Sequence, residues 1–148
     1  MSDQDLMQLY SRRILALTAA IPHLGRLPAP QGSAMRRSPQ CGSTVTVDVV
    51  LDGGKVTDFA QEVRACALGQ ASAAVLGSAV IGHTRDEIAA ARDALEAMLK
   101  RGGPVPGAPF EALEALSPAR DFPNRHASIL LAWDATLAAL DTAQATAA

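Results

Sequence analysis

An alternating strand followed by a glycine turn constrains this chain more than any other feature of its sequence. Residues 44–51 read Thr-Val-Thr-Val-Asp-Val-Val-Leu, with an apolar side chain at every second position from Val45. This period of two predicts a strand with one buried face. Asp52-Gly53-Gly54 supplies a turn, and residues 55–63 carry enough Val, Thr and Phe to return antiparallel. The sequence therefore predicts a β-hairpin over residues 44–63.

The register of this hairpin decides which residues meet at its open end. A two-residue loop places Cys41 opposite Cys66, and a three-residue loop places Cys41 opposite Ala65. The three-residue loop also sets Phe59 across from Val47 on the buried face, so the hydrophobic pattern favours it. In either register the two cysteines lie within one residue of facing each other.

The rest of the chain predicts helices on both sides of the hairpin. Leu and Ile recur at helical spacing over residues 3–20, and the segment from Pro22 to Pro39 is expected to form an ordered connection or a short edge strand at about 33–37. The segments expected to be helical after the hairpin are residues 67–81, a capping box Thr84-x-x-Glu87 leading to about Lys100, one or two turns at 110–116, and a final helix beyond Pro123. A small antiparallel sheet of about three strands, packed against an N-terminal helix and a long C-terminal helix, is an α+β domain.

Length and composition exclude several classes of function. The 148 residues are 49% hydrophobic and 19% charged with net charge -2, which fits one domain over residues 1–148. One Trp, one Tyr and three Phe, with no basic run longer than Arg-Arg, give no surface for nucleic acid. No apolar stretch reaches the roughly 20 residues that cross a bilayer. With two cysteines and an acidic N-terminus, the chain is expected in the cytoplasm.

The two cysteines are the candidate chemical site. Cys66 lies where the predicted strand gives way to a helix of small residues, so the helix dipole favours its thiolate, the form that binds metal or attacks sulfur. Cys41 lies on a connection beside the start of a strand. Two thiolates side by side form a candidate soft-metal or sulfur site. The alternative is that both act as small buried hydrophobic residues.

Four stretches of the chain occur in one order that matches a known family. They are Tyr10 with the first helix, Cys41-Gly42, Cys66 in Arg64-Ala65-Cys66-Ala67 before residues 70–74, and Phe122-Pro123-Asn124-Arg125 leading to residues 128–133. In these stretches the chain resembles the U-type iron-sulfur cluster assembly scaffolds, the group that contains IscU, SufU and the N-terminal domain of NifU. The resemblance implies a small antiparallel sheet backed by helices, with three cysteines and an aspartate gathered at one tip.

The resemblance also implies which residues hold metal. Cys41 and Cys66 match the first two cysteines of the family, Ser43 stands where the family has aspartate, and Ser128 stands where it has the third cysteine. His126 lies two positions before Ser128, and is either an accessory ligand or proton donor, or a helix cap or surface residue. One protomer then offers two strong ligands, because a serine hydroxyl stays protonated near neutral pH.

A [2Fe-2S] cluster or a zinc ion takes four ligands, usually Cys or His. Three completions are open: His126 with Ser128 or water, a second protomer in a homodimer that bridges one cluster, or a partner protein. The fourth interpretation is a degenerate site that holds no cluster.

The function that the resemblance implies is a scaffold or carrier for transient iron-sulfur clusters, without catalytic turnover. A cysteine desulfurase is then the partner that supplies sulfur, and apo-proteins or carriers accept the cluster. Two alternatives stay open. One is a cluster-free adaptor or regulator of the desulfurase, and the other is a sulfurtransferase relay in which Cys66 carries a persulfide.

Overall fold

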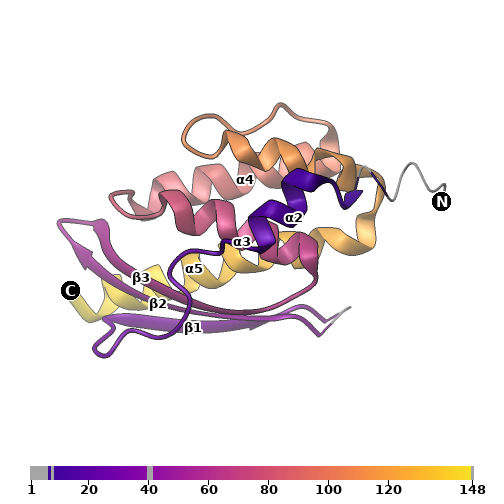
Figure 1. Cartoon of the computed structure of the whole chain (residues 1–148). Helices are drawn as coiled ribbons and strands as arrows, with labels where there is room; N and C mark the ends of the chain where they lie inside the picture. The colour runs from indigo at the N-terminus through magenta and orange to yellow at the C-terminus, as the bar shows by residue number, and fades with distance from the viewer. Residues whose placement is uncertain (1–6, 8, 40–41, 148) are drawn as a thin grey trace.

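A three-stranded antiparallel sheet lies against a layer of helices in the computed structural model, which describes residues 7, 9–39 and 42–147 (Figure 1). The strands, in sheet order, are β1 (Gly32–Arg37), β2 (Thr44–Asp52) and β3 (Lys55–Arg64). The helices are α2 (Arg12–Thr18), α3 (Ala67–Ala79), α4 (Arg85–Arg101), η1 (Glu111–Asp121), η2 (Pro123–Arg125) and α5 (His126–Ala147). The α+β class, the edge strand and the long C-terminal helix are confirmed.

The helices form two layers above the sheet. α5 packs along β1 and β2, and α3 lies beside α5 (Figure 1). α2 packs on α3, and α4 packs on α5 and η1, farther from the strands. In the parts of the chain that the structure describes, no helix combines the length and the hydropathy needed to cross a membrane.

The turn of the hairpin is tighter than the favoured prediction. Asp52 pairs with Lys55 around a two-residue turn, in which Gly53 and Gly54 have φ angles of 60° and 79°. Positive φ at both central residues suits glycine and is typical of the turn whose twist matches a hairpin. The prediction of a three-residue loop is therefore wrong.

A β-bulge beside the turn returns the apolar side chains to the core. Thr57 is an extra residue in β3, and beyond it the register shifts by one. Phe59 consequently lies opposite Val49, and not opposite Val47 as predicted. Without the bulge, the two-residue turn would set Phe59 opposite Asp48, on the other face of the sheet. The bulge and the tight turn together keep Phe59 buried, at 3% exposure.

The predicted N-terminal helix is interrupted, because Met7 and Leu9 are helical but Tyr10 lies in a turn. Within the predicted range 3–20, α2 begins after Ser11, whose hydroxyl accepts a hydrogen bond from the Ile14 N–H at 3.3 Å. Residues 3–6 and 8 lie outside the described residues. The capping box of α4 is confirmed, because Thr84 and Glu87 exchange side-chain to backbone hydrogen bonds of 3.2 and 2.9 Å.

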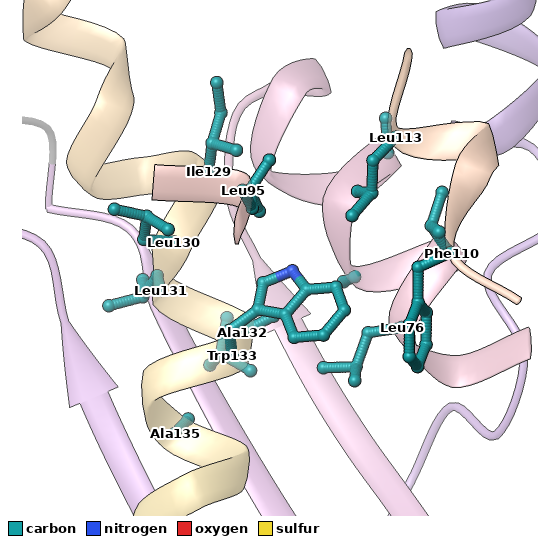
Figure 2. Close-up of a cluster of buried hydrophobic side chains, with 14 of the residues drawn as sticks. Leu76, Leu95, Phe110, Leu113, Ile129, Leu130, Leu131, Ala132, Trp133 and Ala135 are labelled. Atoms are coloured by element: carbon teal, nitrogen blue, oxygen red, sulfur yellow. The ribbon is translucent and has the colours of Figure 1, made fainter. Parts of the chain in front are cut away.

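Trp133 anchors α5 in the centre of the core, as predicted. Its side chain is fully buried and lies among apolar side chains that include Leu76 and Phe110 (Figure 2). Its Nε1–H donates to the Ser72 hydroxyl at 2.9 Å, and that hydroxyl donates to the Ile129 carbonyl at 2.7 Å. This chain of hydrogen bonds fixes α3 against the first turns of α5.

Asp48 points away from the helices and is nevertheless fully buried. The loop before β1 covers it, because Arg26 donates two hydrogen bonds at 2.7 and 3.1 Å and the Leu27 N–H donates one at 3.0 Å. The Ser33 hydroxyl of β1 donates a further hydrogen bond at 2.6 Å. Burial alone raises the pKa of Asp48, but these hydrogen bonds outweigh burial and hold the pKa below its usual value. The outer face of the sheet is therefore pinned to the loop by one carboxylate.

Candidate functional site

Cys66, Ser43 and Ser128 meet at the end of the sheet that lies opposite the hairpin turn. The Cys66 Sγ lies 3.4 Å from the Ser128 Oγ, which lies 3.4 Å from the Ser43 Oγ. Both serines are buried, at 6% and 3% exposure, whereas Cys66 is half-buried and forms no disulfide among the described residues. The structure thus brings three of the five predicted site residues into one thiol-hydroxyl cluster.

Each member of the thiol-hydroxyl cluster comes from a junction between elements. Ser43 directly precedes β2, Cys66 is the N-cap of α3, and Ser128 is in the first turn of α5. The Cys66 backbone is extended, with φ −65° and ψ 169°, and its side chain makes no capping hydrogen bond. Two helix N-termini therefore flank the thiol, and their dipoles favour negative charge between them.

Gly69 lets α3 approach α5 closely enough for the contact between Cys66 and Ser128. It lies three residues after Cys66, on the same face of α3. A Cβ at this position would come within 2.9 Å of both the Ser128 Oγ and the Ala65 Cβ. The small-residue composition of α3 predicted close backbone approach but did not distinguish Gly69 from its neighbours. Its i+3 spacing from Cys66 is the signal that identifies it.

Cys41 lies outside the described residues, but the residues on either side of it are held together. The Ser38 N–H donates to the Ser43 carbonyl at 2.8 Å, and the Gly42 N–H donates to the Ser38 carbonyl at 3.0 Å. Gly42 has a φ angle of 71°, which favours glycine. These hydrogen bonds close the connection between β1 and β2 directly beside Ser43.

His126 is not a surface residue, in contrast to one prediction, and it caps the C-terminal end of η2, where its backbone N–H donates to the Pro123 carbonyl. It is buried, at 5% exposure, and its Nε2 donates a hydrogen bond of 2.8 Å to the Ala119 carbonyl in η1. The ring therefore joins the start of α5 to η1 and does not bond to the thiol-hydroxyl cluster. A ligand role through Nε2 would break this buried hydrogen bond, whereas a ligand role through Nδ1 would keep it.

The spacing within the cluster suits ligands of one tetrahedral ion. With metal-ligand distances of about 2.0 to 2.3 Å, two ligands on a tetrahedral ion lie about 3.5 Å apart. The Cys66 to Ser128 separation of 3.4 Å is close to this value. Hydroxyls are weak donors beside thiolates, and among the described residues His, Cys, Asp and Glu form no group of three that could hold a metal ion. Strong ligation thus needs donors beyond Cys66, Ser43 and Ser128.

Fold and cluster together define a class of protein: a small α+β domain that presents a thiol where one end of a sheet meets two helix N-termini. The sequence model of the NifU-like N terminal domain matches residues 9–142. The chain belongs to the NifU-like N-terminal domain family.

Two curated relatives carry the name iron-sulfur cluster assembly scaffold protein IscU. The protein from Streptococcus pyogenes serotype M1 is 30% identical over 114 residues, which cover 76% of this chain and 70% of the relative. The protein from Thermotoga maritima is 26% identical over 125 residues, which cover 84% and 87%. These relatives share most of their length with this chain.

Solved structures give the same relationship. A nitrogen-fixing NifU-like protein (N-terminal) from Brucella abortus has a TM-score of 0.92 at 44% identity, covering 95% of this chain and 98% of that one. FiSufU of the SUF system from Fervidobacterium islandicum AW-1 has a TM-score of 0.79 at 25% identity, covering 90% and 98%. The fold described above is therefore the fold of these scaffold-type proteins.

Proposed function

We propose that this chain is an iron-sulfur cluster assembly scaffold that receives iron and sulfide at Cys41 and Cys66. Membership of the NifU-like N-terminal domain family supports the scaffold function. The observation that carries the assignment to this site is the meeting of Cys66 with Ser43 and Ser128 between two helix N-termini. Those three positions come from separate parts of the sequence and converge at one end of the sheet.

The hydroxyls support the sulfur atoms and do not replace the missing ligands. A serine hydroxyl at 3.4 Å from sulfur can donate a weak hydrogen bond, which stabilises negative charge on a thiolate or a bound sulfide. Iron and zinc take thiolate, imidazole or carboxylate far more readily than a protonated hydroxyl. Each protomer therefore contributes two thiolates and a polar wall.

Two protomers complete the ligand set if each supplies Cys41 and Cys66 to one bridging [2Fe-2S] cluster. This arrangement uses thiolates alone and leaves the buried His126 bonded to η1. It predicts that cluster-loaded protein is dimeric and metal-free protein monomeric. Native mass spectrometry of both forms tests it, and a loaded monomer with a full cluster would contradict it.

Sulfur would come from a cysteine desulfurase and the finished cluster would pass to an apo-protein or carrier. We expect no catalytic turnover from the scaffold itself. Two thiols that must stay reduced suit the cytoplasm.

The experiment is anaerobic reconstitution followed by iron, zinc and acid-labile sulfide analysis with an absorption spectrum. Stoichiometric iron and sulfide are expected in the unmodified protein and in Ser43→Ala, and both should be lost in Cys41→Ala and in Cys66→Ala. Equal iron binding in Cys41→Ala, in Cys66→Ala and in the unmodified protein would contradict the assignment of the site to these cysteines. Ser128→Cys is the matched gain variant, because it adds a third thiolate at ligand distance from Cys66. It should retain its cluster longer against a chelator.

The half-exposed thiol of Cys66, with a hydroxyl 3.4 Å from its sulfur, also favours a second candidate function. In a sulfurtransferase relay, the Cys66 thiolate attacks the outer sulfur of a desulfurase persulfide, and the desulfurase thiolate leaves. Incubation with desulfurase and cysteine without iron would then add one sulfur to Cys66, as measured by peptide mass spectrometry. If the mass of the Cys66 peptide does not change, the relay is excluded.

A further inference from the structure

A groove with unpaired positive charge lies beside the thiol-hydroxyl cluster. It has a volume of about 390 Å³ and runs between the end of β1, α4 and the start of α5. Its lining includes Ala127, the neighbour of Ser128, and Ser38, whose N–H donates to the Ser43 carbonyl. The groove is therefore joined to the site on two sides, although it contains none of the cluster's side chains.

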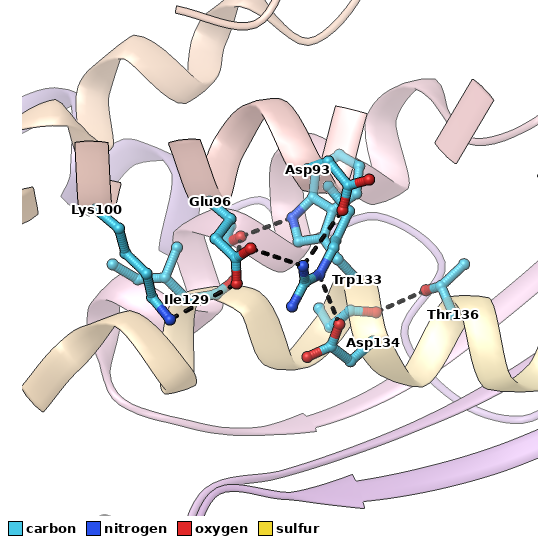
Figure 3. A network of polar contacts seen from close by, with 10 residues as sticks. Asp93, Glu96, Lys100, Ile129, Trp133, Asp134 and Thr136 are labelled. Carbon is cyan, nitrogen blue, oxygen red and sulfur yellow. Dashed lines mark hydrogen bonds and ion pairs between the residues drawn. The ribbon is translucent and has the colours of Figure 1, made fainter. Parts of the chain in front are cut away.

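The acidic side chains of the groove are already used by the basic side chains on α4. Arg92 contacts Asp134 at 2.9 Å and Glu96 at 3.3 Å, and Lys100 contacts Glu96 at 3.6 Å. Figure 3 shows Glu96 and Lys100 on α4 facing Asp134 on α5. This network neutralises one wall and holds it in place. No carboxylate of the groove remains for the opposite wall.

The opposite wall carries two arginines that have no ionic partner. Within the described ranges, Arg36 and Arg37 at the end of β1 form no ion pair, and both are exposed. The side chain of Arg37 extends toward the turn, where its Nη2 lies 3.9 Å from a Cβ built on Gly42. Guanidinium groups donate in a planar fork that matches the two oxygens of a carboxylate or phosphate.

Between the arginines and the core, Ser38 provides a buried donor without a partner. The residue is 2% exposed, and its Oγ has no hydrogen bond to any described residue. A buried hydroxyl normally finds a partner, because leaving it unbonded costs free energy. A hydroxyl in this state in the lining of a positively charged groove is a donor that an anionic ligand could use.

We propose that this groove binds a small oxyanion, a molecule that carries carboxylate or phosphate groups, between the Arg36 and Arg37 guanidinium groups and the Ser38 hydroxyl. The volume suits a molecule of metabolite size. The site is distinct from the thiol-hydroxyl cluster, so the inference does not depend on cluster assembly.

Isothermal titration of the metal-free protein at low salt tests the proposal, with citrate and inorganic phosphate as probes. At least one of them should bind with 1:1 stoichiometry and weaken at physiological salt, because exposed charges are screened. Arg36→Gln/Arg37→Gln should weaken binding about tenfold or more, since two charge-assisted contacts are lost. Ser38→Ala should weaken it to a smaller extent. The matched control Arg12→Gln/Lys55→Gln removes the same charge from exposed residues outside the groove, and should leave binding within about twofold.

Two further arms keep the result interpretable. Titration of Cys41→Ala/Cys66→Ala should give the same affinity as the unmodified protein, which separates this site from the proposed scaffold function. A glutamate-rich peptide is the third probe. Binding of the peptide alone would overturn the small-molecule proposal in favour of an acidic protein segment. Absence of binding by all three probes, or binding unaffected by Arg36→Gln/Arg37→Gln, would overturn it entirely.

Discussion

Gly69→Ala tests whether the thiol-hydroxyl cluster depends on close packing between α3 and α5. In an ordinary helix interior, alanine is more favourable than glycine by up to about 1 kcal/mol. Here the added methyl group would lie 2.9 Å from the Ser128 Oγ and from the Ala65 Cβ, and 3.1 Å from the Ser128 carbonyl oxygen. Normal contact begins near 3.4 Å. The two helices would therefore have to separate by about half an ångström.

Overpacking of this kind costs about 1 to 3 kcal/mol. After the gain in helix propensity is subtracted, the free energy of unfolding should fall by about 1 kcal/mol, or about 2 to 4 °C in Tm for a chain of this size. Urea unfolding followed by the fluorescence of Trp133, which is the only tryptophan, measures the change. The thiol reactivity of Cys66 should change in the same variant.

Two controls isolate the contact with Ser128. Gly107→Ala adds a methyl group to open space and should leave the stability nearly unchanged. The double variant Gly69→Ala/Ser128→Ala removes one of the overlapping atoms, so it should be less destabilised than the sum of the single variants. A stability gain near 1 kcal/mol in Gly69→Ala would show that α3 and α5 have free space between them, and the packing argument would be refuted.

Three further substitutions test the framework. Asp48→Asn should lower stability at neutral pH and reduce the loss of stability with falling pH below about pH 4. The pKa of Asp48 is lowered in the folded protein, so the carboxylate stabilises fully above the pKa of the unfolded chain, and this contribution is lost as the pH falls through the folded-state pKa. An unchanged dependence of stability on acid pH would contradict this. Ser72→Ala should lower the free energy of unfolding in urea by about 1 to 3 kcal/mol, since it leaves the buried Trp133 Nε1–H without an acceptor. A change near zero would contradict this. Gly32→Ala should destabilise strongly in the same assay, because its Cβ would overlap the Ala139 carbonyl oxygen and lie 2.6 Å from the Ala143 nitrogen; near-normal stability would show that α5 can move.

Local patterns in the sequence predicted most of the elements correctly. The alternation in β2, the capping box at Thr84 and the apolar spacing around Trp133 each arise from interactions between near neighbours. The register of the hairpin was beyond local reasoning, because Phe59 reaches the core opposite either Val49 or Val47. Which pairing forms depends on a bulge that responds to packing across the whole sheet.

The residues of the candidate site could be predicted from the sequence better than the buried polar contacts around them. Cys66 was predicted from the hairpin and the start of the next helix, whereas Ser43 and Ser128 followed from resemblance to a family, and the structure brings the three together. The burial of His126 depends on a carbonyl in η1, a segment whose length the sequence pattern underestimated. The buried Asp48 was missed as well, because a polar residue on the outer face of a strand gives no sign that a loop covers it.

The bulge at Thr57 makes the chain unequally tolerant of insertions and deletions. Beyond the bulge, the ladder runs without a break to the pair Thr44 and Arg64, the last step before Ser43 and Cys66. Deleting Thr57 alone would remove the bulge and keep every pair from Val50 and Asp58 onward, whereas deleting a paired residue such as Ala60 would slide the rest of β3 by one residue, about 3.3 Å, and turn its core side chains to the outer face. A longer loop between Gly53 and Gly54, in contrast, leaves the ladder beyond the bulge unchanged. The pairing next to Ser43 and Cys66 thus depends on the number of paired residues in β2 and β3, and not on the length of the turn.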